Sequence, residues 1–95
     1  MPAVSRQDDQ CSGHGCFPPR RSTAGSPNVF CNGKPVLRKG DPFEAHACGD
    51  HTHTATVSAG SGTVFVNGLA LARIGDALDC GSVVAAGSSN VFAGG

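Results

Sequence analysis

Residues 25–41 read GSPNVFCNGKPVLRKGD and residues 60–76 read GSGTVFVNGLALARIGD, and the two stretches align without a gap. A third copy begins at Gly87 as GSSNVFAGG. The stretch AVSRQD at residues 3–8 matches the closing half, with Gln7 in place of the glycine. Self-similarity at a fixed period indicates a repeat architecture. Each unit runs from an aspartate through a loop to a Gly-Ser-x-x-Val-Phe strand, and the three aspartates are Asp8, Asp41 and Asp76.

Three copies in a chain of 95 residues favour a closed pseudo-threefold arrangement over an open solenoid. We expect one domain over residues 1–95, with repeat units at about 3–33, 36–68 and 71–94 and no effector extension. Fourteen Gly and six Pro predict many turns and short elements. No segment has a sustained helical period, so the sequence predicts an all-β fold with little or no helix.

The repeats carry their own strand signals. Residues 29–31 and 64–66 are short β-prone runs, and each is followed by Asn-Gly, which favours a two-residue type I′ hairpin turn. The return strands are expected at residues 35–38 and 70–73. Pro35 lacks an amide donor, so its strand is expected at an edge or a bulge.

Charge and hydropathy exclude several classes of protein. Lys plus Arg equals Asp plus Glu, which gives no sign of a nucleic-acid or anionic-membrane partner. No apolar run has the length of a transmembrane helix, and residues 1–10 lack the pattern of a signal peptide.

The five cysteines, an odd number, cannot all pair within one chain. Four histidines lie among them, which favours a metal site, and a structural disulfide is not expected. All four His and four of the five Cys fall in the loops between the repeats, at residues 10–20, 43–53 and 77–81. If the units meet around an axis, these loops converge at one end.

Register narrows the ligand set. Cys80 lies eight residues before Ser88, and His53 lies eight residues before Ser61, so these two side chains should point the same way. His14 and His46 lie five or six residues after the aspartates of their units. Three imidazoles and one thiolate would close a tetrahedral structural zinc site, and the set is His14, His46, His53 and Cys80.

Alternatives remain open at several of these positions. Cys48 competes for the metal because it lies two residues from His46, and His51 could replace His53. Cys31 stands where the second copy has Val66, so it is interpreted as a small buried hydrophobe. Cys11 and Cys16 are either packing residues or spare thiols, and the aspartates after the glycines are interpreted as turn caps.

The repeated stretches resemble the PAAR-repeat family, named for a Pro-Ala-Ala-Arg motif that is degenerate here as Pro35-Val36-Leu37-Arg38 and Ala70-Leu71-Ala72-Arg73. The loop GHGCFPPR at residues 13–20 and the segment from Cys80 to Phe92 are also similar to this family. The resemblance covers essentially the whole chain.

The resemblance implies a conical β-fold whose base caps the C-terminal β-helix of a trimeric valine–glycine-repeat (VgrG-type) spike, one copy per trimer, in a type VI secretion system. It implies one zinc ion near the tip, held by His14, His46, His53 and Cys80. On this basis the protein is expected to be a non-enzymatic spike tip for membrane puncture and effector delivery. It would assemble in the cytoplasm and then leave the cell, or enter a target cell, with the spike.

Two other functions are compatible with the sequence. One is the tip of a contractile phage-tail baseplate, to which the same physical arguments apply. A zinc-dependent hydrolase would need an open coordination position and a general base, for which Glu44 is the obvious candidate in the loops. A separate effector could also travel as cargo.

Overall fold

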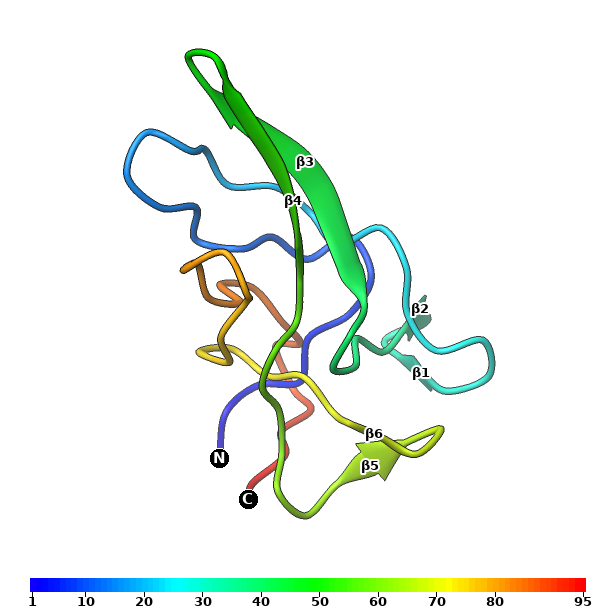
Figure 1. Ribbon diagram of the computed structural model, residues 1–95. Coiled ribbons are helices and arrows are strands. Elements are labelled where there is room, and N and C mark those ends of the chain that lie inside the picture. The colour runs from blue at the N-terminus through cyan, green and yellow to red at the C-terminus, as the bar shows by residue number, and fades with distance from the viewer.

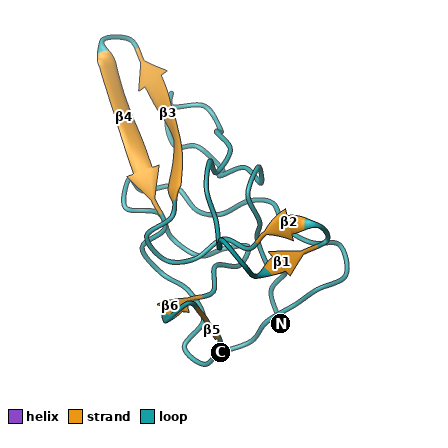
Figure 2. Ribbon diagram, turned by 90° about the vertical axis from the view of Figure 1, so that its right-hand side faces the viewer, coloured by secondary structure: helices purple, strands orange, loops and turns teal.

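The structure is a computed structural model that describes residues 1–95, and it contains strands and loops but no helix (Figures 1 and 2). It therefore has no helix that could cross a membrane. Six short strands form three antiparallel two-stranded sheets, which confirms the all-β prediction. The strands are β1 (Phe30–Cys31), β2 (Lys34–Pro35), β3 (Pro42–Cys48), β4 (His51–Thr56), β5 (Phe65–Val66) and β6 (Leu69–Ala70).

The two Asn-Gly hairpins form as predicted. β1 pairs with β2 across Asn32-Gly33, whose φ angles are 55° and 79°. β5 pairs with β6 across Asn67-Gly68, with φ angles of 55° and 78°. Positive φ at both central residues is what a type I′ turn requires. Each return strand begins one residue earlier than predicted and leaves its hairpin after two residues.

The chain beyond each return strand pairs with the other repeats around a pseudo-threefold axis. The amide of Ser5 donates to the carbonyl of Ala72, Ala72 donates to Leu37, and Leu37 donates back to Ser5, at 2.9–3.0 Å. All three residues have no exposed surface. A cycle of three backbone hydrogen bonds closes the arrangement, as the repeat predicts, and an open solenoid would leave its ends unpaired.

An arginine–aspartate pair recurs in each repeat. Arg38 donates from its backbone amide and its guanidinium to Asp41, at 2.8–3.0 Å, and Arg73 does the same to Asp76, at 2.8–3.1 Å. The aspartates thus close a turn, as their interpretation as caps predicted. The arginines also reach neighbouring repeats, since Nη1 of Arg38 donates to Asn67 at 3.1 Å.

The first repeat corrects the register read from the sequence. Arg6 pairs with Asp9 and not with Asp8. Asp8 instead has a φ of 78° and stands where the other repeats have Gly40 and Gly75, both at 93°. The alignment had placed Gln7 at the glycine position. It was wrong by one residue because an aspartate can adopt the left-handed conformation that the turn needs.

The repeated Gly-Ser pair fixes where each unit starts. The Oγ atoms of Ser26, Ser61 and Ser88 each accept hydrogen bonds from the amides two and three residues ahead, at 2.9–3.2 Å. The preceding glycines lie against backbone. A Cβ at Gly60 would sit 2.8 Å from the carbonyl oxygen of Leu71, and Gly25 and Gly87 face equivalent contacts at 2.7 Å.

A third hairpin corrects a second prediction. Residues 43–53 were interpreted as a loop, but β3 and β4 pair along most of their length and place the Gly49-Asp50 turn at the end of the molecule away from both termini (Figure 1). The β-branched alternation in HTHTAT and the Gly-Asp pair between the strands are hairpin signals. The histidines and cysteines in this segment also suit a loop that carries metal ligands, which is how the segment was interpreted.

Two small apolar clusters lie along the axis. The first, in the wide part, takes residues from all three repeats and includes Cys31 and Val66, which confirms that Cys31 is a buried hydrophobe. The second cluster contains Phe43, Leu78 and Val84 and packs against Cys80. The extents of 38 × 24 × 23 Å describe an elongated body with two nearly equal short dimensions.

We expect Gly60→Ala to destabilise the fold by about 1–3 kcal/mol, because the added methyl group meets backbone that cannot move without opening the ring. Gly94→Ala is the matched control, since its Cβ would meet only the flexible side chain of Met1 at 3.2 Å. Urea unfolding of both variants measures the difference. Equal free energies of unfolding would contradict the close approach described for Gly60.

Candidate metal centre

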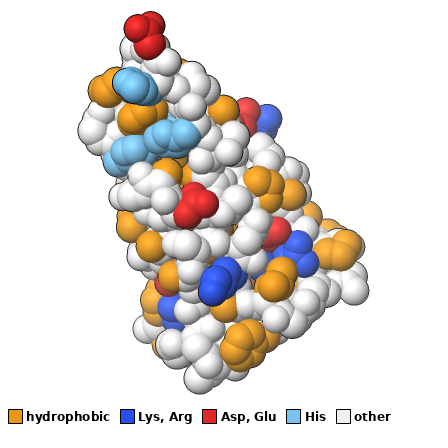
Figure 3. Space-filling model, viewed as in Figure 1, with side chains coloured by type: hydrophobic (Ala, Val, Ile, Leu, Met, Phe, Trp, Pro, Cys, Tyr) orange, Lys and Arg blue, Asp and Glu red, His pale blue; other side chains and the backbone are white.

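Three histidines and one cysteine from different parts of the chain come together in one group. Figure 3 shows histidines gathered toward the narrow end of the molecule. His14 lies in the first loop, where a backbone bridge to Phe17 closes a tight turn. His46 and His53 lie opposite each other on β3 and β4. Cys80 lies in the third, short loop. Each of the three repeats therefore contributes at least one of these side chains.

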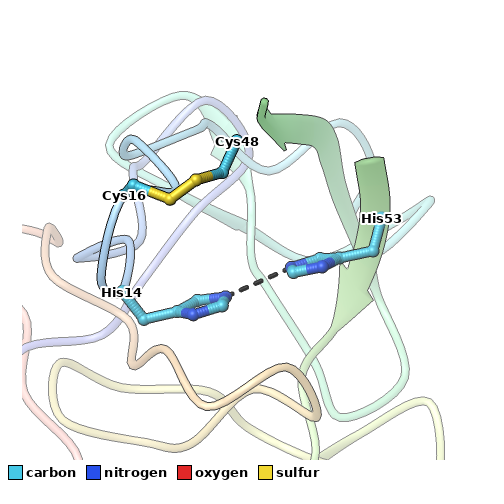
Figure 4. Close-up of a disulfide and its surroundings, with 4 residues drawn as sticks. All are labelled: His14, Cys16, Cys48 and His53. Carbon is cyan, nitrogen blue, oxygen red and sulfur yellow. Dashed lines mark hydrogen bonds between the residues drawn. A yellow bond between two sulfur atoms is a disulfide. The ribbon is translucent and has the colours of Figure 1, made fainter. Parts of the chain in front are cut away.

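The donor atoms of the four residues converge on one point. All four lie within 4.8 Å of one another. Nε2 of His53 lies 3.2 Å from Nε2 of His14 and 2.5 Å from Nε2 of His46. The dashed line in Figure 4 marks the contact between His14 and His53. A tetrahedral zinc site with bonds of roughly 2.0–2.3 Å needs donor separations of roughly 3.3–3.7 Å. The His14–His53 separation is close to that range, the His46–His53 separation is shorter, and the remaining separations are at most 4.8 Å.

The protonation of the imidazoles suits a cation. Nδ1 of His46 lies 2.9 Å from the carbonyl oxygen of Pro18, so it carries the proton and donates. Nε2 of His46 therefore presents a lone pair to the cluster, in the arrangement by which metal-bound histidines are usually oriented. The pKa of His53 is lowered by desolvation and then by His46 and His14, which favours its neutral form.

Hydrogen bonds alone cannot pair all the imidazole nitrogens of this cluster. Three Nε2 atoms face a common centre, and one N–H on His53 could be directed at only one of the other two. A cation at the centre would accept a lone pair from every donor. The four residues thus fit a metal ion better than they fit a hydrogen-bonded cluster.

Apolar and buried groups surround the cluster. The ring of Phe17 lies against all three imidazoles, with centroid separations of 4.7, 5.0 and 4.3 Å to His14, His46 and His53. His46 is only 2% exposed, and Cys80 packs against the core. His14, His53 and Cys80 are half-buried, so of the four donor residues His46 is the one most shielded from water, and electrostatic interactions are strengthened most there.

The structure separates the proposed ligands from their competitors. His14, His46, His53 and Cys80 form the group, whereas His51 and Cys48 lie outside it. His51 pairs with Cys48 at the end of the β3–β4 hairpin and is exposed. With Asp9 as the aspartate of the first repeat, His14 and His46 each follow their aspartate by five residues (14 − 9 and 46 − 41).

The absence of a disulfide was a wrong expectation. Cys16 and Cys48 form one, with their Cα atoms 5.5 Å apart (Figure 4). An odd number of cysteines excludes complete pairing but not a single bridge. The hairpin, which was interpreted as a loop, is what carries Cys48 to the first loop. Cys11, Cys31 and Cys80 remain free.

Two residues at the site were missed from the sequence. The Pro18 carbonyl orients His46, and the Phe17 ring covers the imidazoles. Pro18 could have been found, because it lies eight residues before Ser26, as His53 and Cys80 lie before their serines. The position of Phe17 depends on the His14 turn, and the sequence carries no signal for it.

The sequence matches the family model described as the PAAR motif over residues 12–86, which is most of the chain and includes the four clustered residues. A search of curated proteins finds no match.

We expect His53→Ala to reduce the bound metal from one ion per chain to well below one, because it removes the donor that contacts both other imidazoles. His51→Ala is the matched control on the same strand and should retain the full metal content. Elemental analysis of both purified variants by mass spectrometry makes the comparison. If His51→Ala loses the ion and His53→Ala keeps it, the donor set is wrong at this position.

Proposed function

Because the chain belongs to the PAAR-motif family, a structural family and not a family of enzymes, we propose that it is the tip of a trimeric VgrG-type spike. The main observation behind this proposal is that the two ends of the molecule carry different features. A four-donor cluster lies toward the narrow end, and two of the repeated hairpins lie at the other end with both termini (Figure 1). A PAAR-motif chain with this arrangement is consistent with a spike tip.

We propose zinc as the ion at the tip. Three imidazoles and one thiolate are a donor set that zinc prefers, and four protein ligands are typical of structural sites. The proposed role of the ion is to order the loops, because the chain around the site has little regular structure. Ordering each loop residue costs about 1–2 kcal/mol. A structural zinc site contributes about 10–16 kcal/mol of apparent binding free energy in small peptides, which offsets much of that cost.

The wide end supports the docking part of the proposal. Phe30, Phe65 and Phe92 occupy the same position in the three repeats and are 58%, 59% and 50% exposed. The valine that precedes each of them is 37–40% exposed. Apolar side chains exposed at equivalent positions around an axis suit a partner with the same symmetry. The end of a trimeric β-helix offers that symmetry and could extend the short hairpins by strand addition.

One copy per trimer follows from the pseudo-threefold axis, because a single chain already presents three equivalent contacts. We propose that this assembly takes place in the cytoplasm and that the tip then travels with the spike out of the cell or into a target cell. A separate effector could travel with it as cargo. A phage-tail baseplate would use the same two ends, and the genes beside this one would distinguish the two machines.

A hydrolase is less well supported. Four protein donors would fill a tetrahedral ion and leave no position for a reacting water. Glu44, the candidate base, pairs with Arg21 at 3.3 Å. A structural role for the ion accounts for both features.

We expect the isolated protein to co-elute with the cognate spike trimer at one copy per trimer, measured by size-exclusion chromatography with light scattering. Phe65→Ser should weaken this binding about tenfold or more, because a buried aromatic anchor contributes about 1–3 kcal/mol or more at an interface. Calorimetric titration gives the affinity.

Val83→Ser is the control for an exposed apolar side chain, since Val83 is 38% exposed but lies just after the third loop. It should bind like the unaltered protein. Wild-type affinity of Phe65→Ser, in a variant that keeps its metal and its melting temperature, would show that the spike does not use the proposed face.

A further inference from the structure

Cys16 and Cys48 lie side by side just outside the four-donor cluster (Figure 4). Cys16 sits in the turn of the first loop, and Cys48 is the last residue of β3. Their Cα separation of 5.5 Å is at the centre of the range found for disulfides. The two residues are 32 positions apart in the chain, so the bond joins segments that sequence proximity does not hold together.

The disulfide joins residues that lie close in the chain to two of the proposed metal ligands. Cys16 follows His14 by two residues, and Cys48 follows His46 by two residues. The ion and the disulfide would therefore tie the same two segments, the first loop and β3. The third loop, which carries Cys80, would be tied by the ion but not by the disulfide, and hydrogen bonds between Asp79 and Thr56 also hold it.

Exposure makes this pair chemically distinct from the other cysteines. Cys16 is exposed and Cys48 is half-buried. Cys11 and Cys31 are 1% and 6% exposed. Cys80 belongs to the donor cluster, and a thiolate bound to a metal is not available for exchange. Oxidation is thus directed to the Cys16–Cys48 pair, since thiol exchange requires access to the sulfur.

We propose that Cys16 and Cys48 are a reversible thiol–disulfide lock, which is open in a reducing compartment and closes when the protein meets a disulfide oxidant outside it. The closed lock keeps the first loop on the β3–β4 hairpin when the metal is lost. The timing of closure rests on the proposed delivery out of the cell, whereas the chemistry of the pair does not.

The oxidation balances with a small-molecule disulfide such as glutathione disulfide as the oxidant. The more exposed thiolate, that of Cys16, attacks one sulfur of the oxidant, forms a mixed disulfide and releases one glutathione thiol. The thiolate of Cys48 then attacks the Cys16 sulfur, forms the internal bond and releases the second glutathione thiol. The protein loses two electrons and two protons, and the oxidant gains both.

The consequence is a tip with two independent restraints. A cross-link across 32 residues restricts the unfolded chain strongly, so it should raise the melting temperature of the metal-free protein by about 10 °C or more. With the metal bound, the two segments are already held, and the effect of the lock should be smaller. Each restraint thus matters most when the other is absent.

The experiment compares four states of the full chain: oxidised or reduced, each with its metal or after chelation with EDTA. The reductant is a phosphine, which brings no competing thiol to the metal. Alkylation after denaturation counts free thiols by mass, and hydrogen exchange reports on residues 12–20 and 43–54. Cys16→Ser removes the lock, and Cys31→Val is the matched control because the second repeat has Val66 at that position.

We expect glutathione disulfide to convert the reduced, metal-bound protein from five alkylated thiols to three, with a loss of two hydrogens and no retained glutathione. The metal-free oxidised protein should keep the exchange protection of both segments, and the metal-free reduced protein should lose it. Cys31→Val should behave in the same way, with one fewer thiol in each state. Cys16→Ser should lose protection on chelation whether or not the oxidant is present.

Five alkylated thiols after the oxidant, or retained glutathione on a single cysteine, would overturn the lock. So would equal loss of protection in the oxidised and reduced metal-free proteins. A protein that shows the expected thiol counts but does not bind the spike trimer would refute the proposed function and leave the lock intact.

Discussion

The cycle of backbone hydrogen bonds among Ser5, Leu37 and Ala72 is the constraint on which the rest of the structure depends. The chain is short of large apolar side chains, and its strands are mostly two residues long, so neither a deep core nor a wide sheet can hold it together. Backbone groups buried on the axis must be paired or the fold loses stability. Because each repeat donates to one neighbour and accepts from the other, removing any repeat leaves the other two with unpaired groups. The fold is therefore cooperative despite its small size.

The geometry that the three repeats share follows from that cycle of hydrogen bonds. Each arginine–aspartate pair closes the turn immediately after the axis, and each Gly-Ser pair starts the next strand against the backbone of another unit. The loops between an aspartate and the following serine are free to differ in length. Side chains from all three loop regions meet in the group of His14, His46, His53 and Cys80.

The sequence predicted the parts of the fold that repeat. The Asn-Gly hairpins, the closed threefold arrangement and the burial of Cys31 follow from local turn chemistry and from the alignment of the units. The parts of the fold that do not repeat were harder to predict from the sequence. The β3–β4 hairpin belongs to one unit only, and its histidines and cysteines made it resemble a loop. The contact between Cys16 and Cys48 depended on that hairpin, so it could not be predicted once the strands were missed. For the group of His14, His46, His53 and Cys80, the register paired only His53 with Cys80; Cys48 and His51 stayed open as alternatives, and the full set was what the family resemblance implied.

The proposed roles of the two ends of the molecule require different symmetry. A threefold partner requires three equal contacts, and the Phe30, Phe65 and Phe92 positions are nearly equal in exposure. A tetrahedral ion requires four donors, which three identical loops cannot provide. The loops resolve this by differing at two positions, five residues after the aspartate and eight before the serine. The first repeat has His14 and Pro18 there, the second has His46 and His53, and the third has Gly81 and Cys80. Four of the six positions thus carry donor side chains. A fifth, Pro18, offers only its carbonyl, which orients His46. Divergence of the loops is therefore what a symmetric base and the proposed metal site would together require.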